Sequence, residues 1–569
     1  MSKSLSVLSF TVALAATLTA CGGGGGTAAP APATPTPPPS GASVTLTGIA
    51  ARGAALAGAT VDVKCAGGNG TPAITSAAGA YSVSIAGASL PCAFKVTGTD
   101  GTVLHSLRAG TENTGSFNVN ITPLTELVVA RAASVAPASF FSAYASATAP
   151  SAAVVTDAIS AVRTATAGVV DLSGVNPITD TLVAASAGTA GNALDQKIDA
   201  LVAGLTAAQT TLAAVSSALV SNTGTVAPVA TLLQPATTNC AALRSGRFHT
   251  ISPGEADPLA RVGRLDWNSQ NLTATFGDNS TATYVDQGGC KFRSESAQWI
   301  DTAVVSSAGL VINQSQSKTV PSEVYVSVAL PAQTLPVADF AGSWNVAIWQ
   351  SASGTAQNDV YAETLEITFN ASGAITSLLA CEGLAACVSE PNPATLTVNA
   401  TDGGFNITDQ GSVIGRFFLF KNAAGQPVFV GVLNDDGSVL VGTPKRALGA
   451  LPALGAVSEF RELSLRGNDT VDLWIDQSTT VTAVDTATRT VTRLRASDSR
   501  VDMIGYDKPR DGLRYRAANS CTTNGAPSGC AQTAQIPLQG MGVTLSVSVG
   551  RTMPAAQSFF NISVGKPGN

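Results

Sequence analysis

The sequence holds few of the residues on which common enzyme classes depend. Only two of its 569 residues are histidine, and charged residues make up 12% of the chain. It contains no Gly-x-Ser-x-Gly elbow, zinc-protease motif or Walker loop, so serine-hydrolase, zinc-protease and nucleotide chemistry lack their usual parts. No two cysteines have the Cys-x-x-Cys spacing that marks many zinc sites. We therefore expect no enzyme activity, no catalytic residue, no metal and no cofactor.

Basic runs and aromatic residues are also scarce. The chain has 31 Lys and Arg against 37 Asp and Glu, a formal net charge of −6, and aromatic residues make up 5%. This mildly acidic balance excludes nucleic acid as a partner. A chain of 569 residues is too long for one hydrophobic core. Because Gly, Ala, Ser, Thr and Val dominate, we predict a mainly β, multidomain protein.

The first twenty residues have the layout of a secretory signal peptide. Lys3 precedes an apolar run from Leu5 to Leu14, which is too short to remain as a membrane span. The tetrapeptide from Leu18 to Cys21 resembles the lipobox of bacterial lipoproteins. That resemblance implies removal of residues 1–20 and attachment of lipid to the Cys21 sulfur, which would be the contact with the membrane.

A tether is predicted over residues 21–43. Gly22 to Gly26 form a flexible run, and the six prolines between Thr27 and Ser40 favour a stiff polyproline spacer. In lipoprotein terms, glycine directly after the lipidated cysteine implies sorting to the outer membrane. We expect a body held away from that membrane, in the periplasm or exposed at the cell surface.

Eight cysteines are left once Cys21 carries lipid, an even number suited to an oxidising compartment. Eight cysteines allow 105 connectivities, but pairing each with its nearest neighbour keeps every bridge inside one predicted module. The predicted disulfides are Cys65–Cys92, Cys240–Cys290, Cys381–Cys387 and Cys521–Cys530.

Residues 44–121 alternate short β runs with glycine turns. Gly48, the run Leu56 to Val63, and the run Gly79 to Val83 resemble the pattern of the carboxypeptidase-regulatory-like, or transthyretin-like, β-sandwich. The resemblance implies a spacer or binding module without catalytic residues.

An α-helical domain is predicted over residues 122–234. Thr122 followed by Pro123 is typical of a helix N-terminus, and another helix is expected to start near Ser151. From Leu194 to Leu219 the apolar residues recur in steps of four and three, which predicts one helix of about seven turns.

Strand-like alternation returns after Pro235 and continues to the end of the chain. We predict about three antiparallel meander modules, each a sandwich or a barrel, over residues 235–334, 335–456 and 457–569. Phe248, Trp344 and Phe460 recur at similar positions in the three modules, which indicates a faint internal repeat.

Trp344 is a candidate for a ligand pocket. Gly342-Ser343-Trp344 resembles the Gly-x-Trp of lipocalin-like barrels, in which the tryptophan lies beneath a cavity for a small apolar ligand. A tryptophan packed in an ordinary core is the alternative, and we favour it.

One basic cluster stands out near the C-terminus. Its arginines are suited to contact an anionic glycan or a lipopolysaccharide phosphate, because a guanidinium group binds such groups bidentately. Aspartates are interleaved with them, which favours alternating charge on a solvated strand face instead. The candidate anion contacts are Arg493, Arg495, Arg514 and Arg516.

These observations rank three functions. The first is a non-catalytic cell-envelope lipoprotein with a binding, adhesive or structural role, whose partner is an envelope glycan or another protein. The second is a lipocalin-like lipoprotein that carries a small ligand. The third is a glycan-active enzyme that uses two carboxylates, such as Glu363 and Glu366.

Overall fold

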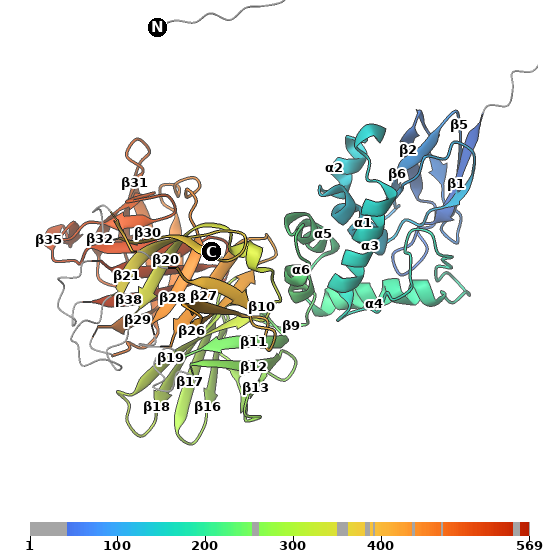
Figure 1. Ribbon diagram of the computed structural model, residues 1–569. Helices are drawn as coiled ribbons and strands as arrows, with labels where there is room; N and C mark the ends of the chain where they lie inside the picture. The colour runs from blue at the N-terminus through green and yellow to red at the C-terminus, as the bar shows by residue number, and fades with distance from the viewer. Residues whose placement is uncertain are drawn as a thin grey trace, which may run out of the picture. The chain divides into compact units, whose positions relative to one another are not determined.

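The computed structural model describes residues 42–252, 261–349, 362–381, 387–390, 393–434, 438–467, 470–549 and 558–567. The predicted signal peptide, the lipidated Cys21 and nearly all of the predicted tether lie outside these residues. Residues 42–569 form one compact unit. The prediction of a mainly β, multidomain fold is confirmed: the chain forms several β-sheets and a small group of helices (Figure 1).

Two sheets at the start of the described chain enclose one apolar core. The smaller has the order β5-β1-β8, and the larger has the order β3-β2-β6-β7, with β4 also paired to β2. Alternating residues point inward from both sheets, so that Leu46, Val61 and Val83 are buried together. The strands are β1 (Ser43–Ile49), β2 (Thr60–Ala66), β3 (Gly68–Asn69), β4 (Ala73–Ile74), β5 (Ala80–Ala86), β6 (Ser89–Thr97), β7 (Val103–Arg108) and β8 (Gly115–Asn118).

The helical part begins as predicted, with Thr122 capping a helix that has Pro123 in its first turn. Ser151 caps another, since its side chain accepts a hydrogen bond from the Val154 amide. The helices are α1 (Pro123–Ala133), α2 (Pro137–Ser142), η1 (Ser146–Thr148), α3 (Ala152–Thr166), α4 (Ala193–Ala207), α5 (Leu212–Ser221) and α6 (Ala227–Leu232).

The single long helix predicted from Leu194 to Leu219 is wrong. The chain forms α4 and α5 instead, which are bent by 89° at their junction. Gln209 has a φ of 47°, and the Thr211 side chain accepts a hydrogen bond from the Ala214 amide and so caps α5. The apolar spacing carries across this break and hides it. Among the described residues, no single helix is long and apolar enough to cross a membrane, and α4 with α5 meets that description only as a bent pair.

The first of three C-terminal sheets is an up-and-down meander whose first strand, β11, pairs with its last, β19. A two-stranded hairpin of β9 (Ala236–Thr237) and β10 (Cys240–Arg244) precedes it. We call this curled sheet the first barrel. Its strands are β11 (Gly246–Ile251), β12 (Val262–Asn268), β13 (Thr273–Phe276), β14 (Thr281–Thr283), β15 (Val285–Asp286), β16 (Lys291–Glu295), β17 (Trp299–Val305), β18 (Val311–Ser317) and β19 (Val324–Pro331).

The second barrel repeats this plan after the short helix η2 (Val337–Phe340). Strand β20 pairs with β28, and a bridge between Ala374 and Thr395 joins its two edges. Its strands are β20 (Gly342–Trp349), β21 (Ala362–Phe369), β22 (Ile375–Cys381), β23 (Val388–Ser389), β24 (Thr395–Val398), β25 (Phe405–Asp409), β26 (Ser412–Lys421), β27 (Pro427–Leu433) and β28 (Val439–Pro444).

The third barrel is closed by hydrogen bonds. Strand β29 pairs with β38, β31 pairs with β32, and the β34–β35 hairpin branches from β32. Its strands are β29 (Val457–Arg466), β30 (Ile475–Asp485), β31 (Thr490–Arg495), β32 (Arg500–Tyr506), β33 (Arg514–Arg516), β34 (Cys521–Thr523), β35 (Ala526–Ser528), β36 (Thr533–Leu538), β37 (Val543–Ser548) and β38 (Phe559–Gly565).

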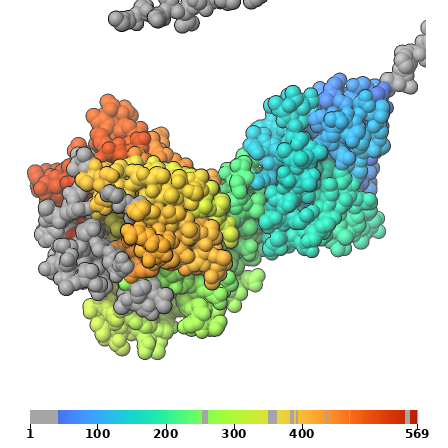
Figure 2. All heavy atoms as spheres, in the orientation of Figure 1, coloured from blue at the N-terminus to red at the C-terminus, as the bar shows by residue number. Residues whose placement is uncertain are grey.

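Outward-facing residues of all three barrels share one apolar cluster. Ile312 of the first barrel, Val430 of the second and Ile536 of the third are all buried in it. In the space-filling view, the second barrel, coloured yellow to orange, lies against the yellow-green strands of the first (Figure 2). The interiors of the first and second barrels each hold a separate apolar cluster, and the third holds a smaller one around Val491 and Ile504.

Candidate functional site

The interior of the third barrel is polar and rich in arginine. Because side chains alternate between the faces of a strand, Arg493 and Arg495 of β31 point to the same side. The register places Arg493 opposite Asp502, and Tyr506 opposite Arg514. These residues line a cavity of about 640 Å³ inside the barrel.

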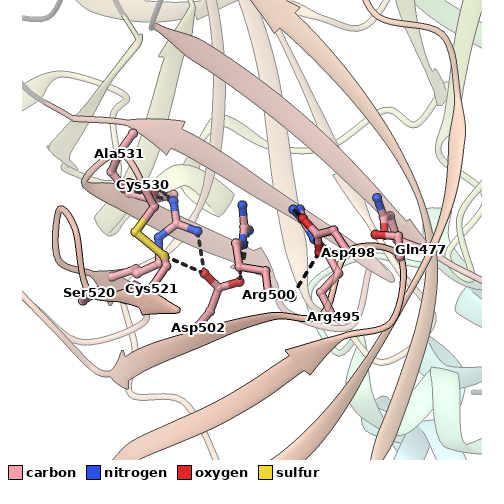
Figure 3. A network of polar contacts seen from close by, with 12 residues as sticks. Gln477, Arg495, Asp498, Arg500, Asp502, Ser520, Cys521, Cys530 and Ala531 are labelled. Atoms are coloured by element: carbon pink, nitrogen blue, oxygen red, sulfur yellow. Dashed lines mark hydrogen bonds and ion pairs between the residues drawn. A yellow bond between two sulfur atoms is a disulfide. The ribbon is translucent and has the colours of Figure 1, made fainter. Parts of the chain in front are cut away.

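Asp502 is the centre of a buried ion-pair network (Figure 3). It is only 8% exposed. Its Oδ2 accepts hydrogen bonds of 3.1 and 3.0 Å from Nε and Nη2 of Arg500, and its Oδ1 accepts one of 2.9 Å from Nη1 of Arg516. Arg516 also donates to the Ala531 carbonyl and to Oγ1 of Thr533, each at 2.9 Å. Arg500 and Arg516 are therefore held by the protein itself.

Arg495 has a carboxylate partner as well. Its guanidinium group donates to both oxygens of Asp498, through Nε at 2.8 Å and through Nη2. These hydrogen bonds raise the pKa of Arg495 and lower the pKa of Asp498 to about 2. The pair fixes Arg495 at the cavity wall.

Arg493 and Arg514 are different. In the described part of the chain, neither forms an ion pair with a carboxylate, and the Nε atom of each is buried without a hydrogen-bond partner. Tyr506 lies between them: its Oη contacts Nη2 of Arg493 at 2.5 Å, and its ring lies 4.8 Å from the Arg514 guanidinium carbon. Both cations face the cavity.

Burial lowers the pKa of Arg514 to about 10, and the positive charge of Arg493 also lowers it. Arg514 thus stays protonated at neutral pH. Two like charges are held close together in a site that is partly removed from water, an arrangement that a bound anion would stabilise. Oγ1 of Thr479, which also lines the cavity, is a further buried polar atom without a partner among the described residues.

Besides the exposed Glu459, the cavity wall holds one more carboxylate, that of Glu462. It accepts a hydrogen bond of 3.1 Å from Oγ of Ser563, and burial raises its pKa. Five arginines therefore meet four carboxylates here, counting Asp498, Asp502, Glu459 and Glu462. The difference, five minus four, leaves a net charge of +1 with Glu462 ionised and +2 with Glu462 protonated. The five arginines are Arg493, Arg495, Arg500, Arg514 and Arg516.

The structure brings all four predicted anion contacts into this one cavity. We expected alternating charge on a solvated strand face; the charges do alternate and several of them pair, but the four arginines line the interior of the third barrel. The sequence reasoning missed Asp502, Glu462 and Thr479. A signal was present for Asp502, since its spacing of two from Arg500 places both on one face of a strand.

Trp344, the predicted ligand-pocket residue, is packed against aromatic side chains inside the second barrel. It is 1% exposed, and its Nε1 donates to the Phe340 carbonyl at 2.7 Å. Its ring centroid lies 5.8 Å from that of Phe340 and 5.2 Å from that of Phe429. The cavities of the first and third barrels are not lined by Trp344.

The four predicted disulfides are confirmed. They are Cys65–Cys92, Cys240–Cys290, Cys381–Cys387 and Cys521–Cys530. The last of them holds the β34–β35 hairpin next to Asp502, since Sγ of Cys521 lies 3.1 Å from Oδ1 of Asp502. Among the described residues, no group of three or more His, Cys, Asp or Glu side chains is arranged to hold a metal ion.

Fold and site together define a protein of three β-barrels, the third with an arginine-lined interior. No family model matches the sequence, and no curated protein matches it. Solved structures with some likeness include transferrin binding protein B from serogroup B Neisseria meningitidis, at 9% identity and a TM-score of 0.17. A double mutant of transferrin binding protein B from Haemophilus parasuis Hp5 has 6% identity and a TM-score of 0.19. Each of these two matches covers 54% of this chain and 65% of the transferrin binding protein B chain.

A protein of unknown function from the DUF3598 family of Nostoc punctiforme PCC 73102 is also similar, at 13% identity and a TM-score of 0.16. It covers 41% of this chain and 98% of its own length.

Proposed function

We propose that this protein is a lipid-anchored binding protein of the bacterial cell envelope, and that its third barrel binds a small anionic ligand. One observation carries the proposal. Arg493 and Arg514 face a cavity of about 640 Å³ with no carboxylate partner among the described residues, and Tyr506 holds them side by side. Two half-buried cations without a carboxylate partner are costly in a fold unless something completes their charge and hydrogen bonding.

The chemistry of the two side chains defines the ligand class. Each guanidinium group presents a planar fork of N–H donors that matches the oxygens of a phosphate or carboxylate. The Nε atoms of Arg493 and Arg514 are buried, so the terminal Nη groups are the donors that would contact such oxygens. A cavity of this size is within the range of sites for small molecules. We therefore assign a phosphorylated or carboxylated sugar, the kind of group that envelope glycans carry.

The enclosed position of the arginines favours a glycan group over a protein partner. Both cations lie inside the barrel, where a sugar can enter but the broad surface of another protein cannot. The anchor rests on the lipobox resemblance at Cys21, and the disulfides suit an extracytoplasmic compartment. In this scheme residues 44–121 act as a spacer module between the anchor and the barrels.

Calorimetric titration of the mature protein tests the binding site. Glucose 6-phosphate is the charged probe and glucose is the matched neutral probe. We expect only the phosphosugar to bind, with affinity reduced at least about 30-fold by the double change Arg493→Gln and Arg514→Gln, because charge-assisted hydrogen bonds are lost. Lys508→Gln removes one positive charge from an exposed position of the same barrel and is expected to leave affinity unchanged. Equal affinity of the double variant and the native protein would refute the site.

Cell fractionation tests the anchor separately. We expect replacement of residues 1–21 by an ordinary cleavable signal peptide to release the protein from the membrane fraction while phosphosugar binding stays intact. Protease added to intact cells then distinguishes the two faces: digestion of the body indicates surface exposure, and protection indicates the periplasm. A cleaved protein without Cys21 that remains in the membrane fraction would contradict lipid anchoring without affecting the binding result.

A further inference from the structure

The interior of the first barrel holds a second, apolar cavity. It has a volume of about 180 Å³. Alanine side chains at facing positions leave this space, because they are too small to fill the barrel between the larger rings. The alanines are Ala274, Ala303 and Ala329, and the aromatic lining consists of Phe248, Trp267, Phe276, Tyr284 and Phe292.

The hairpin of β9 and β10 packs against this interior. Cys240 and Leu243 of β10 are buried in the same apolar cluster as Trp267, and the disulfide to Cys290 fastens the hairpin to the barrel. Nε1 of Trp267 donates to Oγ1 of Thr237 at 3.3 Å. The tryptophan ring is therefore held in place by a covalently fixed segment, and the cavity it borders does not depend on a mobile side chain.

A polar group also borders the cavity. Asn313 lines it, and Nδ2 of Asn313 lies 3.4 Å from Oδ1 of Asp301 and 3.1 Å from Oγ of Ser315. A carboxylate only accepts hydrogen bonds, so the amide nitrogen must face Asp301. The Oδ1 atom of Asn313 is then buried without a partner among the described residues.

From these features we infer that the first barrel binds a small aromatic molecule that carries one hydrogen-bond donor, such as a phenol or an indole. An apolar cavity of about 150 Å³ is large enough for benzene, so about 180 Å³ accommodates a ring with a small substituent. The aromatic walls contact the ring, and Oδ1 of Asn313 accepts the hydroxyl or ring N–H proton.

The charge of this site is opposite to that of the third barrel. No cation is among the residues that line it, and the carboxylate of Asp301 lies beside Asn313. Burial and the nearby Asp301 carboxylate raise the pKa of Tyr284, so that its hydroxyl stays neutral. An anionic ligand would be repelled here. The inference is thus independent of the proposed anion site, and the two ligand classes do not compete.

Titration of the full mature protein with p-cresol, toluene and benzoate tests the inference. We expect one-to-one binding of p-cresol, binding of toluene that is about tenfold weaker because Asn313 stays unpaired, and no binding of benzoate. Asn313→Leu should reduce p-cresol affinity to that of toluene. The double change Arg493→Gln and Arg514→Gln should leave p-cresol binding unchanged.

Ala303→Leu supplies the decisive variant, because its larger side chain fills the cavity. We expect at least a tenfold loss of p-cresol affinity with no fall in melting temperature, whereas Val285→Leu, on the exposed surface of the same barrel, should bind normally. If Ala303→Leu does not fold, Ala274→Val fills part of the same space and is read in the same way. Absence of p-cresol binding to the native protein, or undiminished binding to a folded cavity-filled variant, overturns the inference.

Discussion

The third barrel contains two kinds of arginine, and a pair of substitutions distinguishes them. Asp502→Asn removes the carboxylate that holds Arg500 and Arg516, whereas Arg514→Gln removes a cation that has no carboxylate partner among the described residues. If Arg500 and Arg516 serve the fold and Arg514 serves the ligand, only the first change should destabilise the barrel strongly.

The structure sets the size of each effect. Removing one member of a buried ion pair costs about 3–5 kcal/mol. Arg516 keeps the Ala531 carbonyl and Thr533 as acceptors, and Arg500 is half-buried, so we expect the lower end, about 3 kcal/mol, for Asp502→Asn. Arg514→Gln loses its contact with the Tyr506 ring, worth about 0.5–1 kcal/mol, but it also removes the repulsion by Arg493. The net change for Arg514→Gln should stay within about 1 kcal/mol.

Hydrogen exchange measured by mass spectrometry on peptides from β32 and β33 gives a local readout, which suits a chain with several barrels. A loss of about 3 kcal/mol should accelerate exchange about 100-fold in Asp502→Asn. Arg514→Gln and the surface control Lys508→Gln should differ from the native protein by less than about tenfold. If Arg514→Gln accelerated exchange as much as Asp502→Asn, Arg514 would be part of the structural network, and the reasoning that assigns it to a ligand would fail.

Three further predictions concern other features. Replacing both cysteines of a bridge by serine should lower the free energy of unfolding by about 4 kcal/mol for Cys240–Cys290 and by about 2 kcal/mol for Cys381–Cys387. The first bridge closes a loop of 50 residues and the second a loop of 6, so the first constrains the unfolded chain more. Urea unfolding measures both changes. Glu462→Gln should tighten phosphosugar binding and flatten its pH dependence, because the raised pKa of Glu462 makes native affinity increase as pH falls; calorimetry at several pH values checks this. Burial lowers the pKa of His249 from 6.5 to about 4, because the folded protein favours the neutral imidazole. The unfolded chain therefore binds a proton more readily than the folded protein does, and about 3 kcal/mol of folding stability is lost as pH falls from about 6.5 to 4. His249→Phe, which can still stack on Phe418, should unfold at a lower pH than the native protein in an acid titration.

Local patterns predicted the strands and helix starts well, because period-two alternation and caps are properties of short segments. Thr122 and Ser151 cap helices where expected, and the paired cysteines form the expected bridges. The break between α4 and α5 was not predicted, because the apolar spacing continues through it. Only the N-cap residue Thr211 marks the start of a new helix. The module boundaries and the lipid on Cys21 stay predictions.

The anion site was only half predictable, and the reason lies in the barrel. Alternation shows that Arg493 and Arg495 share one face of β31, but it does not show which face is inside. In most β-sheets that pack on one side, the apolar face is the core and the charged face meets solvent. On β36, β37 and β38 the apolar face packs outward against the neighbouring barrels, whereas the inward face of β31 and β32 carries the charged residues together with the apolar Val491 and Ile504. Only the three-dimensional arrangement of the barrels reveals that inversion.

This inversion explains why one barrel can hold charge while another cannot. In the second barrel the interior is itself the core, and Phe340, Trp344 and Phe429 fill it with rings in contact. In the third barrel, stability comes from outward residues such as Ile536 and Leu545, which are fully or nearly fully buried in the shared cluster. Its interior is thereby relieved of the need to pack tightly. Burying an arginine in a hydrophobic core lowers the stability of the fold strongly, and the penalty is smaller in this polar interior. The cavity between the arginines is suited to a ligand of opposite charge.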